Sequence, residues 1–209
     1  MSTNPDHIIL ACTGASGAPY ALRLLECLVG AGKRIDLIFS RAAHMVFAME
    51  SELALPARPA ELAAFFSEHY DAEAEQIRVY GREDWTAPAA SGSHTAASMV
   101  VCPCTMGTLA AIAHGMSDNL IERAADVMIK ERRQLILVPR ETPFSAIHLE
   151  NMLKLAQLGV VMLAANPGFY YQPQKVSDLV DFIVARLLDQ LQIEHDLMPR
   201  WGMEPYQDG

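Results

Sequence analysis

Short apolar runs alternate with helix-like runs along most of this chain, and this order limits its fold more than any other feature. The apolar runs lack the polar alternation of a half-exposed sheet, and they span residues 7–12, 34–39, 99–102, 135–138 and 160–164. Strands of this kind are typical of a parallel sheet that helices cover on both faces. The sequence therefore predicts an α/β fold, a three-layer α/β/α sandwich with a doubly wound, mostly parallel, Rossmann-like sheet.

The helix-like runs carry apolar residues at helical spacing, and they span residues 19–28, 42–50, 59–70, 106–113, 119–130, 145–158 and 175–191. A length of 209 residues suits one domain. We therefore expect a single domain over 1–209, with residues 51–85 as a surface excursion. Residues 193–209 form a C-terminal tail in this interpretation, and Trp201 and Tyr206 in it would either cover a site or contact another subunit.

Charge and apolar content exclude several classes of partner. The net charge of −9 disfavours nucleic acid and anionic lipid, and no apolar run reaches the ~18 residues of a membrane span. The first residues carry no basic segment before an apolar run, so we expect no signal peptide and a cytoplasmic protein. The four cysteines form no CxxC pair and are interpreted as structural thiols.

The residues that follow the strands are the candidate site, because doubly wound sheets bind ligands beyond the carboxyl ends of their strands. After the first strand comes Thr13-Gly-Ala-Ser-Gly17 and then Pro19, which suits the first turn of a helix. Two glycines permit a tight turn and a close ligand, and free N–H groups at the helix start favour an anion. The turn lacks the GxGxxG spacing of dinucleotide sites. An ordinary strand-to-helix turn explains it equally well.

A second turn of the same kind follows the strand at 99–102. There Thr105 is placed to cap the next helix, whose first turn also carries Gly107 and Thr108. Ser40, with Arg41 beside it, follows the strand at 34–39. Two hydroxyl-rich turns in one sheet suggest a mononucleotide.

Five segments in order resemble the flavin prenyltransferases, the UbiX-like family. They are Thr13-Gly-Ala-Ser-Gly17, Pro103-Cys-Thr-Met-Gly-Thr108, Asp118-Asn-Leu-Ile-Glu-Arg-Ala-Ala-Asp126, Leu137-Val-Pro-Arg-Glu-Thr142 and Asn166-Pro-Gly-Phe-Tyr170. The resemblance extends from residue 7 to about residue 191. The family is similar to the flavin-dependent cysteine decarboxylases in fold and in FMN binding.

The resemblance implies transfer of a dimethylallyl group from dimethylallyl monophosphate to N5 and C6 of reduced FMN. The product, prenylated FMN, serves UbiD-like decarboxylases in ubiquinone biosynthesis and aromatic acid breakdown. The resemblance also implies that FMN lies between subunits of a homo-oligomer, often a dodecamer. The residues implied in FMN binding are Gly14, Ala15, Ser16, Ser40, Thr105, Met106, Gly107, Thr108, Arg123 and Arg140.

The same resemblance implies a prenyl-phosphate site and a set of catalytic groups. The phosphate residues are Lys130, Arg140, Glu141, Tyr170 and Arg186, and the catalytic residues are Ser16, Glu50, Glu141 and Lys130. Arg123 and Lys130 are seven residues apart on one helix, so they share a face about 10 Å apart. A carboxylate can relay protons if burial raises its pKa. From the residues alone, Arg186 is more simply a snorkelling arginine, and Glu50 a solvated helix end.

The sequence predicts no metal site, because its seven histidines form no HExxH or similar spacing and no DDxxD cluster is present. One alternative is an FMN-dependent decarboxylase that acts directly on an aromatic or cysteinyl acid. His94 lies closer to Pro103 than the base of the cysteine decarboxylases does, and Pro139-Arg-Glu-Thr142 stands where those enzymes have Pro-x-Met-Asn. Another alternative is a flavin-binding partner or regulatory subunit without catalysis.

Overall fold

The computed structural model of the protein describes residues 3–199. It forms two compact units, residues 1–165 and 166–209. The single domain over 1–209 and the role of the tail over 193–209 stay predictions. Trp201 and Tyr206 lie outside the described residues.

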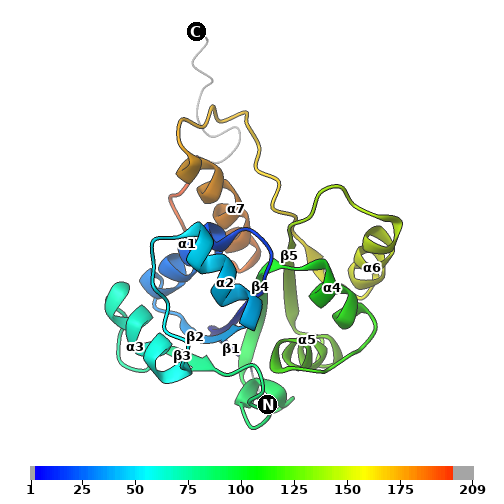
Figure 1. The fold of residues 1–209 in the computed structure, drawn as a ribbon. Helices are drawn as coiled ribbons and strands as arrows, with labels where there is room; N and C mark the ends of the chain where they lie inside the picture. The colour runs from blue at the N-terminus through cyan, green and yellow to red at the C-terminus, as the bar shows by residue number, and fades with distance from the viewer. Residues whose placement is uncertain (1–2, 200–209) are drawn as a thin grey trace. The chain divides into compact units, whose positions relative to one another are not determined.

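A six-stranded sheet forms the centre of the first unit, and every neighbouring pair of its strands is parallel. The strands are β1 (Asn4–Cys12), β2 (Arg34–Phe39), β3 (Ile77–Tyr80), β4 (Ala96–Cys104), β5 (Gln134–Pro139) and β6 (Val161–Met162). Their order across the sheet is β3-β2-β1-β4-β5-β6 (Figure 1). The order reverses between β1 and β4, and doubly wound sheets bind ligands beyond the carboxyl ends of the strands at such a point. The predicted fold class is confirmed.

Helices connect the strands of the first unit. They are α1 (Ala18–Gly30), α2 (Arg41–Glu50), α3 (Pro59–His69), the 3-10 helix η1 (Pro88–Ala90), α4 (Met106–Ala113), α5 (Leu120–Lys130) and α6 (Ala146–Gln157). These bounds agree with the predicted runs to within a few residues, because turn and capping residues mark most of the ends. Gly159 follows α6 with a φ of +87°, a conformation in which glycine is not strained.

The two faces of the sheet pack against different helices, because successive side chains of a strand point in opposite directions. Ile38 belongs to a buried cluster with α4, α5 and α6. Phe39, the next residue of β2, packs instead against Phe47 of α2 and Phe66 of α3, at ring-centroid distances of 4.9 and 6.2 Å. The chain therefore has the predicted three layers.

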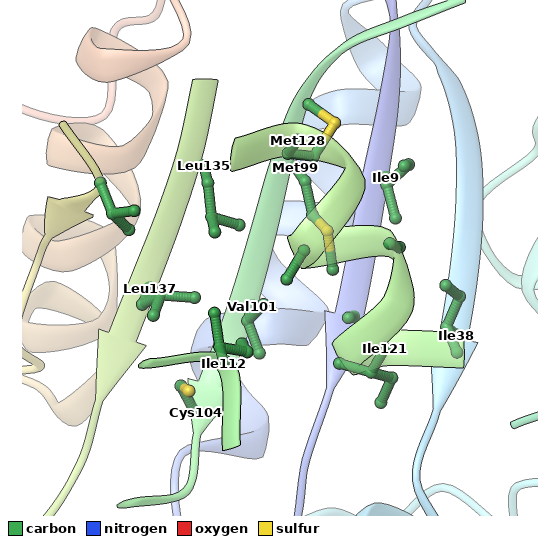
Figure 2. Close-up of a cluster of buried hydrophobic side chains, with 14 of the residues drawn as sticks. Ile9, Ile38, Met99, Val101, Cys104, Ile112, Ile121, Met128, Leu135 and Leu137 are labelled. Carbon is green, nitrogen blue, oxygen red and sulfur yellow. The ribbon is translucent and has the colours of Figure 1, made fainter. Parts of the chain in front are cut away.

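The buried cluster on the α4 and α5 face holds the carboxyl ends of the central strands in place. Figure 2 shows Met128 of α5 beside Met99 of β4, and Ile112 of α4 beside Val101 and Cys104 near the carboxyl end of the same strand. All five side chains are at most 5% exposed. Burying one such side chain fully stabilises a fold by about 1.5–3 kcal/mol, so this face is a rigid support for the turns that follow β1 and β4.

Two features of the sheet differ from the sequence-based prediction. The fourth strand does not stop before Pro103 but continues to Cys104. The register between β4 and β5 shifts between Val101 and Cys104, and at such an irregularity the missing N–H of proline costs no regular ladder bond. The second feature is β3, which lies within the stretch expected to be a surface excursion and pairs with β2.

The second unit contains one long helix, α7 (Val176–Gln190). It buries Ile183, Val184, Leu187 and Leu188, which lie in the predicted apolar stripe. In the part of the chain that the structure describes, no helix has the length and apolar character needed to cross a membrane.

Candidate active site

Thr13 joins the two turns at the point where the strand order reverses. Its Oγ1 donates to the carbonyl oxygen of Pro103 at 2.7 Å and accepts from the N–H of Thr105 at 2.8 Å. The N–H of Thr13 also donates to the Pro103 carbonyl at 3.2 Å. Thr13 is 1% exposed, so water does not compete for these bonds. The turn after β1 and the turn after β4 are therefore fixed as one unit.

The helices that follow β2 and β4 begin with the predicted hydroxyl residues. Ser40 caps α2 by accepting from the N–H of Ala43 at 3.0 Å. Thr105 caps α4 by accepting from the N–H of Thr108 at 3.1 Å, which confirms its expected role. Both helix starts point partial positive charge at the carboxyl edge of the sheet.

A cavity of about 560 Å³ opens at this edge. That volume lies in the range of small-molecule and cofactor sites. Its lining includes five residues predicted to bind FMN, namely Gly14, Ser40, Thr105, Gly107 and Thr108. Thr13, Arg41, Ala42, Met45, Arg82, Asn119, Ile121 and Glu122 complete the lining. Two arginines and several helix starts in one cavity suit an anionic ligand such as a phosphate.

Three polar residues of this cavity were missed in the sequence. Arg82 follows β3, and it was overlooked because that strand was not expected. Asn119 caps α5 by accepting from the N–H groups of Ile121 and Glu122, at 3.0 and 3.2 Å. The buried carboxylate of Glu122 in turn accepts from Nδ2 of Asn119 at 2.6 Å. Asn119 and Glu122 lie in the segment Asp118–Asp126, which is one of the five that resemble the family. The signal that could have revealed Asn119 was its position as a capping residue before an apolar run.

Other predicted flavin residues do not line the cavity. Ala15 is buried, Ser16 is exposed, and the side chain of Met106 belongs to the apolar cluster. Arg123 donates from Nε to the carbonyl oxygen of Ala90 at 3.0 Å. It also pairs with Asp126 at 2.8 Å.

Glu50 occupies the start of α1, which was expected to present free N–H groups to an anion. Its Oε2 accepts from the N–H of Gly17 at 2.8 Å and from the N–H of Ala18 at 2.9 Å. The anion at this helix start is thus a side chain of the protein, and the expectation of free donors there was wrong. The interpretation of Glu50 as a merely solvated helix end was also wrong.

The charge state of Glu50 follows from these contacts. Burial raises the pKa of Glu50. Hydrogen bonds from Ser16, Gly17 and Ala18, together with the charge of Arg140, lower the pKa by more, so that it lies below its ordinary value. Burial therefore does not raise this pKa toward neutrality, and Glu50 is a carboxylate at pH 7. Glu50 thus interacts with two other predicted residues, Ser16 and Arg140.

Lys130 and Arg140 lie at opposite ends of β5. Lys130 ends α5, four residues before β5 begins, and pairs with Glu131 at 2.9 Å. Arg140 follows the last residue of β5, and its N–H donates to the carbonyl oxygen of Cys104 at 3.4 Å. The strand between them spans roughly 20 Å. The resemblance implies that Lys130 and Arg140 bind one phosphate, but Lys130 lies away from the carboxyl edge of its own sheet, because α5 runs antiparallel to the strands. Glu141 accepts from the N–H of Thr142 at 3.1 Å.

In the second unit, Tyr170 and Arg186 line one cavity of about 610 Å³. The ring of Tyr170 lies 5.8 Å from the ring of Phe182, edge to face. Arg186 is exposed and pairs with Asp189 at 2.6 Å. The structure thus brings together the two residues of this unit that were assigned to the prenyl phosphate.

His94, the residue considered as a decarboxylase base, is buried and lies 2.8 Å from Asp36. Asp36 is near the start of β2, so His94 lies at the amino ends of the strands, away from the cavity. This position argues against His94 as a base acting on a ligand at the carboxyl edge.

The doubly wound sheet, its hydroxyl-lined cavity and the helix starts around it define an α/β protein of the mononucleotide-binding class. The family model described as Flavoprotein matches residues 1–188. Flavin prenyltransferase UbiX of Pseudomonas aeruginosa is 59% identical over 200 residues, which cover 96% of each chain. The chain belongs to the UbiX flavin prenyltransferase family.

Solved structures agree with this relationship. The structure of AnUbiX in complex with FMN and dimethylallyl pyrophosphate has a TM-score of 0.84 and 36% identity, and covers 98% of this chain and 100% of that one. A dodecameric FMN-dependent Ubix-like decarboxylase from Escherichia coli has a TM-score of 0.81 and 40% identity, and covers 93% of this chain and 98% of that one. The resemblance inferred from the five sequence segments is confirmed.

Proposed function

We propose that this chain is a flavin prenyltransferase that transfers a dimethylallyl group from dimethylallyl monophosphate to N5 and C6 of reduced FMN. The cavity of about 560 Å³ where the strand order reverses carries this proposal, since it combines hydroxyls, helix starts and two arginines. The product would be prenylated FMN for UbiD-like decarboxylases, in ubiquinone biosynthesis or aromatic acid decarboxylation. Family membership supports the choice of reaction over direct decarboxylation.

The residues that would hold FMN are those of the two joined turns and of the start of α2. Thr105, Thr108 and Ser40 offer hydroxyls, and the helix starts offer positive potential to a phosphate. Gly14 and Gly107 let the backbone approach the ligand closely. The remaining candidates are Ala15, Ser16, Met106, Arg123 and Arg140. Bound reduced FMN would supply N5 and C6 as the nucleophilic positions.

Tyr170, Arg186, Arg140 and Lys130 would hold the donor phosphate. A dianion taken out of water needs several charged donors, because an unpaired buried charge is costly. Arginine can bind phosphate through two parallel hydrogen bonds, and the hydroxyl of Tyr170 adds a neutral donor that can protonate the leaving phosphate. Arg186 would have to exchange its pairing with Asp189 for the phosphate.

Lys130 lies at the far end of β5 from Arg140, so we infer that it would join this clamp from a second copy of the chain. We therefore infer a homo-oligomer whose active site includes residues of two subunits. The dodecameric relative from Escherichia coli supports an assembly of that size. We also infer a cytoplasmic location, which suits the free state of all four cysteines.

Glu50, Ser16 and Glu141 would handle protons during the reaction. Bonding of the prenyl group to N5 breaks its bond to phosphate and releases the N5 proton. Ring closure onto C6 releases a second proton and adds one to the prenyl double bond, so groups that accept and donate protons are needed. Glu50 is ionised at neutral pH, and it is linked by hydrogen bonds to Ser16 and to the start of α1. A positioned base contributes typically ~10²–10⁴-fold to a rate.

The test is to incubate the purified protein with reduced FMN and dimethylallyl monophosphate, and to weigh the extracted flavin. We expect a flavin heavier by one prenyl unit, with inorganic phosphate released in equal amount. Dimethylallyl pyrophosphate should be assayed in parallel, because AnUbiX was crystallised with it. An unchanged flavin with both donors would contradict the proposal, and release of CO2 from an aromatic or cysteinyl acid would favour the decarboxylase instead. FAD as the extracted flavin would contradict the cofactor assignment.

A further inference from the structure

Three potential metal ligands from separate segments converge at the amino ends of β1, β2 and β4. Nε2 of His7 lies 3.1 Å from Oδ2 of Asp36, and Nε2 of His94 lies 2.8 Å from the same oxygen. One ligand atom from each residue lies within 4.8 Å of the other two. Local spacing could not reveal this group, because the three residues are 29 and 58 positions apart in the sequence.

We propose that His7, Asp36 and His94 form a structural binding site for one divalent transition-metal ion of the zinc class. Two imidazole nitrogens and a carboxylate oxygen are a ligand set that zinc accepts. A four-coordinate ion would take its fourth ligand from outside this trio. The site would tie the starts of three neighbouring strands together.

Burial and unsatisfied polar atoms are the main support for this site. His7, Asp36 and His94 are 5%, 2% and 8% exposed. Among the described residues, Oδ2 of Asp36 and Nε2 of His94 have no hydrogen-bond partner, although they face each other at short distance. Buried polar atoms without partners are costly, and a cation between them would satisfy both atoms at once.

The surroundings of His7 and His94 resemble the outer shell of a metal site. Nδ1 of His7 lies 3.0 Å from Oγ1 of Thr95, a contact that leaves Nε2 directed at Asp36. Ligating histidines ordinarily hold their second ring nitrogen in this way. The guanidinium of Arg133 donates to the carbonyl oxygen of His94 at 2.6 Å and so fixes its backbone.

The charge of the site also suits a cation. Asp36 contributes a carboxylate oxygen that both histidine nitrogens approach. Arg78, its neighbour across the strands, is paired with Glu75 at 2.9 Å.

This site is separate from the candidate active site. His7 precedes Thr13 by six residues of β1, a distance of roughly 20 Å along an extended strand. The side chains of His7 and Asp36 point to the same sheet face as Ile9 and Ile38, which α4 and α5 cover. The proposal therefore does not depend on prenyl transfer, and turnover should persist when this ion is removed.

The experiment starts from full-length protein stripped with a chelator and dialysed, and titrates it with zinc by calorimetry. We expect one tight equivalent per chain. Zinc at a hundred times its Kd should raise the Tm by about 5–10 °C. Asp36→Asn and His94→Gln should weaken binding by at least roughly a hundredfold, and Thr95→Val by roughly ten- to a hundredfold as an outer partner. The control is His114→Gln, an exposed histidine outside the trio, which should bind as the wild type does.

The wild-type titration decides the proposal even if a variant fails to fold. Absence of a stoichiometric zinc site in the folded wild-type protein would overturn it and leave the trio as a set of polar contacts. Binding that survives both Asp36→Asn and His94→Gln would likewise overturn it, since the ion would then lie elsewhere. Circular dichroism of each variant shows whether its fold is retained.

Discussion

The backbone N–H of Gly17 donates a 2.8 Å hydrogen bond to Oε2 of Glu50. Glu50 is the last residue of α2, and Gly17 is the residue before α1, so the carboxylate links the end of α2 to the start of α1. Gly17 has a φ of +133°, which side-chain-bearing residues rarely adopt. A negative charge at this helix start is stabilising. The link also orients the carboxylate beside Ser16, next to the proposed flavin site.

Replacing Glu50 by glutamine should reduce the acid sensitivity of the fold. Its pKa in the folded protein lies below the ordinary value, whereas an unfolded glutamate has a pKa of about 4.3. Above about pH 4.3, ionised Glu50 therefore stabilises the folded wild-type protein. This contribution is lost as the pH falls through the pKa of Glu50 in the folded protein. Urea unfolding of the flavin-free protein at neutral and acidic pH measures the loss. Glu50→Gln should lose less stability than the wild type over that range.

The matched control for this prediction is Glu52→Gln, which changes an exposed carboxylate two residues further on. It should keep the pH dependence of the wild type. If Glu50→Gln and Glu52→Gln gave the same pH profile, the hydrogen bonds to Gly17 and Ala18 would contribute nothing measurable to stability.

Thr13→Val should destabilise the fold and loosen both turns. The substitution keeps the side-chain shape but removes the donor to Pro103 and the acceptor for the N–H of Thr105. Buried groups that lose their partners cost about 1–3 kcal/mol, and each kcal/mol lowers the Tm of a chain of this size by roughly 2–4 °C. Calorimetry and FMN titration measure the two effects. The control is Thr86→Val at an exposed threonine, which should change neither the Tm nor FMN affinity. If Thr13→Val kept the Tm of the wild type, the two turns would not need the hydrogen bonds of Thr13 for their stability.

Much of the fold could be predicted because its signals are local. The bounds of β2 and α4 were obtained without error, since Ser40 and Thr105 are capping residues directly after apolar strands. The five resembling segments led to the correct family for the same reason, because each is a short run at the end of a strand or helix. Gly159 also marked the end of α6 correctly.

The contacts between distant segments could not be predicted. Glu50 ends one helix and lies on the start of another 33 residues earlier, and no local pattern records that approach. β3 was missed because an edge strand of four residues, with polar Arg78 inside it, lacks a continuous apolar run. The edge of the sheet at which Lys130 lies could not be predicted either, because a sequence pattern defines one face of a helix, while the direction of the helix depends on the connection.

Gly14→Ala should prevent the turn after β1 from meeting the start of α2. A Cβ added at Gly14 would overlap the Cβ of Ala42, and backbone rather than a flexible side chain would have to move. Gly107→Ala is the matched control, because its Cβ would meet open space in the same cavity. We expect Gly14→Ala to lower the Tm and weaken FMN binding, and Gly107→Ala to keep the Tm of the wild type. Equal Tm values for the two variants would mean that Ala42 can give way at no cost.

Arg186→Ala should weaken use of the prenyl donor and leave FMN binding intact. Losing one charge-assisted contact to the phosphate costs on the order of 1.5–3 kcal/mol, which is roughly ten- to a hundredfold in donor affinity. Tyr170→Phe, in the same cavity, should also slow turnover, because the neutral donor to the leaving phosphate is lost. Arg58→Ala is the control: Arg58 pairs with Glu61 three residues on, as Arg186 pairs with Asp189. The measurements are donor KM, kcat and FMN titration. If donor KM, kcat and FMN affinity were the same for Arg186→Ala and Arg58→Ala, Arg186 would be a surface arginine paired along its helix. It would then not bind the donor phosphate, and the proposal for this site would be contradicted.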